Sequence, residues 1–141
     1  MLFPKRTKYN KQFKGLVKGV TNRGNKLIFG TYALKTQEEA RLTSKQIEAG
    51  RRTIMKKIKR LGFLWVRVFP DIPVTSKPNE VRMGKGKGSV DYWAVRVKKG
   101  QIIYEISGIS PDLAKKALLS GSQKLPVLTN FSTKGAYSLN G

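Results

Sequence analysis

The chain has 141 residues, enough for one domain that buries roughly two-thirds of its unfolded surface but not for two separate cores. Its 29 lysines and arginines against eight acidic residues give a formal charge of +21, far above the magnitude of roughly 2 to 8 that keeps a small domain soluble. Cysteine and histidine are both absent, which excludes disulfides, thiolate metal sites and catalysis by serine–histidine or cysteine–histidine pairs.

Such a charge destabilises the compact state by self-repulsion unless an anionic partner neutralises it. A nucleic acid and an anionic membrane are the two candidate partners, and no apolar run approaches the roughly 18 residues of a spanning helix. The first eleven residues are basic but lack the apolar centre of a secretory signal. We expect a nucleic-acid partner, no membrane, no cofactor and no homo-oligomer.

The N-terminal segment, residues 1–26, is predicted to be an extended basic arm. It has few apolar residues and no steady period, and the first acidic residue is Glu38. Its cations are Lys5, Arg6, Lys8, Lys11, Lys14, Lys18, Arg23 and Lys26. A solvated tail is the alternative, but solvated surfaces mix both signs of charge, so we expect this arm to contact nucleic acid.

Residues 27–34 are predicted to form the first strand and residues 42–62 the first helix. Thr43 can cap the helix, Gln46 completes a capping box and Gly62 is placed to end the helix. At 100° per residue, one narrow stripe of this helix is apolar: Ile47, Ile54, Ile58 and Leu61.

The opposite face of this helix is cationic, with Lys45, Arg52, Lys56, Lys59 and Arg60. From Lys45 to Lys59 the helix spans about 21 Å, which is long enough to follow several phosphates. A basic amphipathic helix can also lie on a membrane or bind an acidic helix. We favour packing on a sheet, since the stripe is rich in isoleucine and leads directly into a strand.

Residues 63–69 alternate like a strand, with Leu64, Val66 and Val68 on one face and Trp65 and Arg67 on the other. Trp65 is interpreted as covering the sheet rather than as a platform for base stacking. Three prolines then divide the chain into short extended pieces: Pro70, Pro73 and Pro78.

The stretch 77–89 is rich in glycine and lysine and contains no acidic residue from Arg82 onward. Glycine lets backbone amides approach another surface, and lysine adds positive charge. The spacing fits neither a Walker loop nor the dinucleotide fingerprint. A flexible connection between strands is the alternative; we interpret the loop as one that faces a polyanion.

Residues 90–98 and 101–107 alternate around Lys99-Gly100 and are predicted to form a hairpin. Their expected core residues are Trp93, Val95, Val97, Ile102, Tyr104 and Ile106. A second helix begins after Ser110 with Pro111 and Asp112 and ends near Gly121. Its expected buried stripe is Leu113, Ala117 and Leu118.

A last strand is expected at residues 125–131. The predicted fold class is therefore α+β, with two helices packed on a mainly antiparallel sheet, a basic arm and a projecting loop. The expected domain organisation is an arm at 1–26, one α+β domain at 27–132 and a loose tail at 133–141.

Several blocks in order and spacing resemble the bacterial-type large-subunit ribosomal protein sixteen family, over nearly the full chain. These blocks are PKRTK from Pro4, QIEAGRR from Gln46, WVRVFPD from Trp65, VRMGKGKG from Val81, and Tyr92-Trp93. The resemblance implies an α+β protein on large-subunit rRNA near the tRNA-binding side, beside neighbouring large-subunit proteins. The chain departs from the family pattern at Phe63, where a basic residue is expected.

Two groups of residues follow from the arm, the helix face and the resemblance together. The expected rRNA-binding residues are Lys5, Arg6, Lys8, Lys11, Lys14, Lys45, Arg51, Arg52, Lys56, Lys59 and Arg60. The loop expected near tRNA and the peptidyl transferase centre is Arg82, Met83, Gly84, Lys85, Gly86, Lys87 and Gly88.

The resulting hypothesis is a structural, non-enzymatic constituent of the large ribosomal subunit that binds rRNA and helps position A-site and P-site tRNA. Lysine and isoleucine outweigh arginine and alanine, which favours a mitochondrial ribosome, with a plastid or the bacterial cytoplasm as alternatives. A free-standing architectural DNA- or RNA-binding protein would explain the charge equally well. A nucleic-acid-modifying enzyme would need Asp71 or Asp91 as metal ligands, and neither has an acidic neighbour in sequence.

Overall fold

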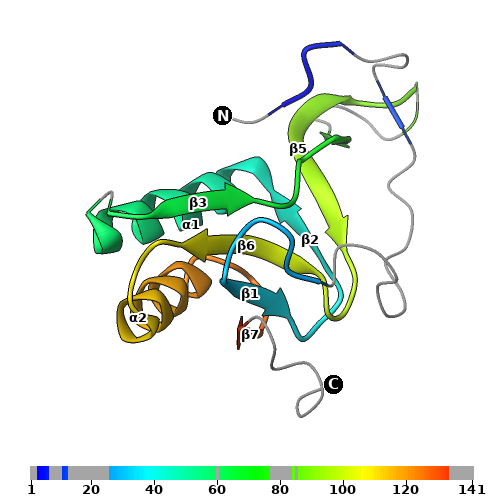
Figure 1. The fold of residues 1–141 in the computed structure, drawn as a ribbon. Helices are drawn as coiled ribbons and strands as arrows, with labels where there is room; N and C mark the ends of the chain where they lie inside the picture. Colours follow the sequence, from blue (N-terminus) through cyan, green and yellow to red (C-terminus); the bar gives the residue numbers. More distant parts are fainter. Residues whose placement is uncertain are drawn as a thin grey trace.

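The computed structural model describes residues 3–6, 11–12, 26–59, 61–76, 84 and 86–133, and these residues form an α+β fold (Figure 1). The elements are β1 (Tyr32–Thr36), β2 (Ala40–Thr43), α1 (Ser44–Ile58), β3 (Phe63–Val66), β4 (Ile72–Ser76), β5 (Ser89–Val97), β6 (Ile102–Ser107), α2 (Pro111–Ser122) and β7 (Thr129–Thr133). The predicted fold class is confirmed.

The strands divide between two antiparallel sheets. One sheet has the order β3-β6-β1-β7 and the other the order β2-β5-β4. In Figure 1, α1 and α2 lie along the first sheet, while β5 rises at the end of the molecule away from α2. The strand β5, which follows the glycine- and lysine-rich loop in the chain, therefore lies at a distance from α2.

The core is centred on β6, an interior strand whose residues Ile102–Ile106 are all fully buried. The hydroxyl of Tyr104 donates a hydrogen bond to the carbonyl of Ile47 in α1 at 2.7 Å. Gly50 of α1 faces the same ring, since a Cβ atom at this position would lie 2.4 Å from the Tyr104 hydroxyl oxygen. Close packing at this point ties α1 to the sheet.

The start of α1 is as predicted and its end is not. Thr43 and Gln46 form the capping box, with reciprocal hydrogen bonds of 3.2 and 3.0 Å. The helix ends at Ile58, because Lys59 adopts the left-handed conformation with φ 53 and acts as the C-cap. Gly62 therefore does not end α1. Leu61 lies beyond the helix and is 69% exposed, so it is not part of the apolar stripe.

The first strand begins at Tyr32, later than predicted. The backbone amides of Ile28 and Phe29 donate to the carboxylate of Glu105, at 2.8 and 3.3 Å, and so make no strand ladder there. Gly30 then crosses β6 so closely that a Cβ atom would lie 2.8 Å from the Ile106 carbonyl oxygen.

The predicted hairpin between residues 90–98 and 101–107 is wrong, although its turn is present. The Gln101 amide donates to the Lys98 carbonyl at 3.2 Å and Gly100 has φ 84. Past this turn the two strands separate, since β5 pairs with β2 and β4 while β6 pairs with β1 and β3. The strand β2 was also missed, because Ala40–Thr43 is a short run that leads straight into the cap of α1.

Other boundaries shift by a few residues. Strand β3 stops at Val66, and the last strand, β7, lies at Thr129–Thr133 rather than at 125–131. Pro73 lies inside β4, which is tolerated because β4 is an edge strand. Helix α2 follows its predicted Ser110 cap, and it buries Ala114, Ala117, Leu118 and Gly121, with Leu113 only partly buried.

Candidate nucleic-acid interface

The surface of α1 that faces away from the core carries a row of cations. Lys45, Arg52, Lys56 and Lys59 are exposed and Arg51 is half-buried. Ile47, Ile54 and Ile58 on the other side are fully buried, so the helix cannot turn without exposing its apolar stripe. Packing against the core therefore determines which side chains of α1 face solvent.

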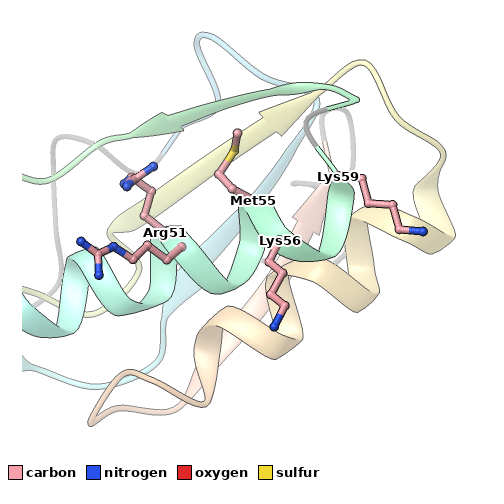
Figure 2. Close-up of a pocket in the computed structure, with 5 residues that line it drawn as sticks. Arg51, Met55, Lys56 and Lys59 are labelled. Carbon is pink, nitrogen blue, oxygen red and sulfur yellow. The ribbon is translucent and has the colours of Figure 1, made fainter.

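A hollow of about 480 Å³ lies on this surface and is lined by α1 and its C-cap residue (Figure 2). Its lining residues are Arg51, Arg52, Met55, Lys56 and Lys59. Figure 2 shows Arg51, Met55 and Lys56 projecting from the helix, and Lys59 from the residue that follows it. Met55 packs against the apolar core and the other four side chains carry positive charge. The hollow thus combines one apolar side chain with four cationic ones, and the cations are suited to phosphate groups.

The carboxylate of Glu48 binds both arginines of this hollow. It accepts from Arg51 Nε at 3.0 Å and from Arg52 Nε at 3.2 Å, and a further short hydrogen bond joins Arg51 Nη2 to Glu48 Oε1. The hydrogen bonds from Arg51 hold the pKa of Glu48 below its ordinary value, and the same contact raises the pKa of Arg51. Glu48 and Arg51 are therefore both charged at neutral pH.

The glycine- and lysine-rich loop joins β4 to β5. It is therefore a connection between two strands, which is compatible with both interpretations of its sequence. Gly84 and Gly86 have φ 92 and φ 94, values that favour glycine, and a Cβ atom at either residue would have no neighbour within 4 Å. These two glycines are therefore exposed and have open surroundings.

Residues 11 and 12 of the arm lie beside this loop. Lys87 Nζ donates to the Gln12 carbonyl at 2.7 Å, and Lys11 Nζ donates to the Lys87 carbonyl at 3.3 Å. The sequence did not predict this contact, because no pattern links residues 75 positions apart. It brings one expected rRNA-binding residue next to the loop expected to face tRNA.

The remaining expected site residues are only partly covered by the structure. Lys5 and Arg6 are exposed, and Gly88 is half-buried at the base of the loop. Six expected residues lie outside the described part of the chain: Lys8, Lys14, Arg60, Arg82, Met83 and Lys85.

A buried cluster around Glu105 was missed by sequence reasoning. Glu105 is fully buried and accepts from Arg67 Nη1 at 3.1 Å, besides the two amides of residues 28 and 29. Arg67 also lies over the Phe29 ring at 5.5 Å, and that ring stacks on Trp65 at 6.0 Å. Trp65 covers the sheet, as predicted. The signal for the cluster was an acidic residue inside the apolar strand IIYEIS. A second signal was Arg67, which shares a face with Trp65 in the predicted strand at residues 63–69.

Asp71 and Asp91 are both exposed. Within the described ranges, no group of three or more acidic side chains is placed to hold a metal ion. Neither described helix is long and apolar enough to cross a membrane.

The fold and this surface define a basic α+β protein with a cationic helix face. The family model for ribosomal protein L16p/L10e matches residues 4–132, and the chain belongs to this family. The chain is 58% identical to large ribosomal subunit protein uL16 of Sinorhizobium medicae and of Bartonella henselae, over 93% of this chain and 96% of each relative. The same protein of Rhizobium rhizogenes is 57% identical over the same shares. The resemblance inferred from the sequence blocks is confirmed.

Proposed function

We propose that this chain is a structural constituent of the large ribosomal subunit that binds large-subunit rRNA through the exposed face of α1 and the basic arm. The observation that carries the proposal is the row of exposed cations on α1, whose opposite side is buried in the core. The relatives reported above are large ribosomal subunit proteins, and this supports the proposal.

The proposed mechanism is electrostatic. Lysine and arginine side chains neutralise phosphates of folded rRNA and hold neighbouring rRNA helices together, and the rRNA in turn relieves the self-repulsion of the +21 charge. On a rigid surface the α1 cations keep their spacing, so they match a fixed arrangement of phosphates better than a mobile tail would. The chain supplies position and charge, and no chemical step is assigned to it.

We further propose that the loop between β4 and β5 helps to align the ends of A-site and P-site tRNA. Its glycines permit close backbone approach and its lysines offer charge to tRNA phosphates. The contact of Lys87 with Gln12 supports this role, because it joins the loop to an arm expected to lie on rRNA. The mitochondrial ribosome stays our proposal for the compartment, and the support for it is the lysine- and isoleucine-rich composition.

The test is incorporation into large subunits in cells that also make the unmodified chain. Replacing the exposed α1 cations should lower incorporation at least about tenfold, because four phosphate contacts are lost while the buried stripe stays. The substitutions are Lys45→Ala, Arg52→Ala, Lys56→Ala and Lys59→Ala. Incorporation is measured by mass spectrometry of large subunits purified at high salt.

The matched control removes four exposed cations outside α1: Lys98→Ala, Lys115→Ala, Lys116→Ala and Lys124→Ala. It changes the net charge equally and should be incorporated almost normally. Equal losses in both variants would contradict docking through α1. Recovery of the unmodified chain with DNA, and not with large subunits, would favour the free-standing architectural protein instead.

The loop is tested in the same cells. Replacing Lys85 and Lys87 with alanine should leave incorporation nearly unchanged while weakening tRNA binding to the assembled ribosomes. If tRNA binding is normal in subunits that carry the loop variant, the proposed role of these two lysines is wrong.

A further inference from the structure

Glu48 is the one acidic residue in α1, and it lies within the surface proposed to bind phosphate. It precedes Arg51 by three residues and Arg52 by four, so all three side chains share one face of the helix. The carboxylate is mostly buried, at 18% exposure, while the Arg51 and Arg52 side chains are 39% and 75% exposed. A negative charge there opposes phosphate binding, so its position calls for a physical reason.

The hydrogen bonds of Glu48 use a defined part of each arginine. Arg51 donates through Nε and Nη2, and Arg52 donates through Nε. A guanidinium has five N–H donors in a rigid plane, so each arginine keeps further donors for another acceptor. Because one carboxylate holds both planes, these remaining donors keep a fixed relation to each other at the hollow.

On the basis of the proposed function, we infer that Glu48 is a positioning residue that orients the guanidiniums of Arg51 and Arg52 for two phosphates of folded rRNA. The carboxylate weakens attraction to polyanions in general and improves the match to one arrangement of phosphates. Glu48 thus sets selectivity for structured rRNA over other RNA, because oriented bidentate donors discriminate by geometry and a mobile charge does not.

Two simpler roles for Glu48 make different predictions. If Glu48 only reduces the local charge, Glu48→Gln strengthens binding to every polyanion by the same factor. If it only stabilises α1, the substitution lowers all binding in proportion to the unfolded fraction. A positioning role alone makes the affinities for structured and unstructured RNA move in opposite directions.

The experiment measures dissociation constants of the full chain for purified bacterial large-subunit rRNA and for poly(U), at one fixed salt concentration. We expect Glu48→Gln to bind poly(U) about twofold more tightly and rRNA several-fold more weakly. The dissociation constant for poly(U) divided by that for rRNA, the selectivity ratio, should therefore fall at least about fivefold. Glu48→Asp keeps the charge but is one methylene shorter. It should lower the rRNA affinity while leaving poly(U) binding as it is in the unmodified chain.

Two controls separate orientation from charge. Glu38→Gln removes an exposed acid from the connection between β1 and β2 and should leave the ratio unchanged. In a chain that already carries Arg51→Ala and Arg52→Ala, adding Glu48→Gln should change the ratio less than about 1.5-fold, because the side chains that Glu48 orients are gone.

An undiminished ratio in Glu48→Gln, with the unmodified chain still preferring rRNA, would overturn this inference and leave the proposed function standing. A fall in both affinities that matches a loss of helix in circular dichroism would overturn it as well. If the unmodified chain shows no preference for rRNA over poly(U), the proposed function itself fails.

Discussion

Two adjacent residues on β6 bind segments that lie on opposite faces of the sheet. Glu105 receives two amides from residues 28 and 29 and the guanidinium of Arg67, so its charge is matched although it is fully buried. Tyr104, the preceding residue, points to the other face and binds the Ile47 carbonyl of α1. Neighbouring residues of one strand thereby hold residues 28 and 29 on one side of the sheet and α1 on the other.

Tyr104 predicts a loss of stability at alkaline pH. Burial, with a smaller contribution from the charge of Glu48, raises the pKa of Tyr104 above its ordinary value of 10.0. The folded state therefore holds this proton more tightly than the unfolded state, and stability falls as pH rises through 10 and beyond. The measurement is the urea concentration at the midpoint of unfolding, at about pH 8 and about pH 11, which bracket the ordinary pKa. Between these pH values the midpoint of Tyr104→Phe should decrease less than that of the unmodified chain.

The control for this prediction is Tyr92→Phe, which alters an exposed tyrosine on β5. It should keep the full alkaline decrease, since Tyr104 is still present in this variant. An identical decrease in Tyr104→Phe and Tyr92→Phe would show that the Tyr104 proton is not linked to folding.

Among the elements, helix α1 has one buried apolar side and one exposed cationic side. Its buried side meets β6 and α2, and its other side carries the hollow and the cations. Lys56 and Lys57 in its last turn also match the negative end of the helix dipole. Gly50 is the point of closest approach, since the Tyr104 hydroxyl leaves no room for a side chain.

Gly50→Ala should therefore destabilise the protein, although alanine is the better helix former by about 1 kcal/mol. The added methyl group overlaps a ring that is held by its own hydrogen bond, and overpacking of this kind costs about 1–3 kcal/mol. Chemical denaturation gives the free energy of unfolding. Lys57→Ala, on the exposed side of the same helix, should change it by less than about 0.5 kcal/mol. A gain of stability in Gly50→Ala would mean that α1 lies farther from β6.

At the scale of the whole molecule, three acidic residues form ion pairs within the protein. Glu48, Glu105 and Glu39 form ion pairs with Arg51 and Arg52, with Arg67, and with Lys99 at 3.9 Å. Three of the seven acidic side chains in the described part of the chain are therefore already matched internally. The excess of positive charge is left for a partner, and binding should depend steeply on salt.

Neutralising about ten phosphates of a duplex-like RNA predicts a slope of about −9 for the logarithm of the binding constant against the logarithm of salt concentration. Removing residues 1–25 deletes seven cations and no acid, so the slope should become shallower by about three to six units. Filter binding to large-subunit rRNA at several salt concentrations measures it. An unchanged slope would place the arm away from the phosphates.

Sequence alone determined the features that depend on neighbouring residues. The α+β class, the N-terminal caps of both helices and the cationic face of α1 follow from local periodicity and from side chains three or four positions apart. The family was also readable, since it depends on blocks of consecutive residues. The left-handed conformation of Lys59 escaped prediction, because lysine has no preference for it and Gly62 offered the more usual ending.

Only the tertiary structure decided what depends on pairs of distant residues. Two alternating strands beside a turn pair as a hairpin unless other partners compete, and here β5 and β6 each find two other strands in separate sheets. The burial of Glu105 against Arg67 and the contact of Lys87 with Gln12 likewise join segments that no local pattern connects. The physical reason is that such contacts depend on where the whole chain folds back, so they are set by packing rather than by sequence order.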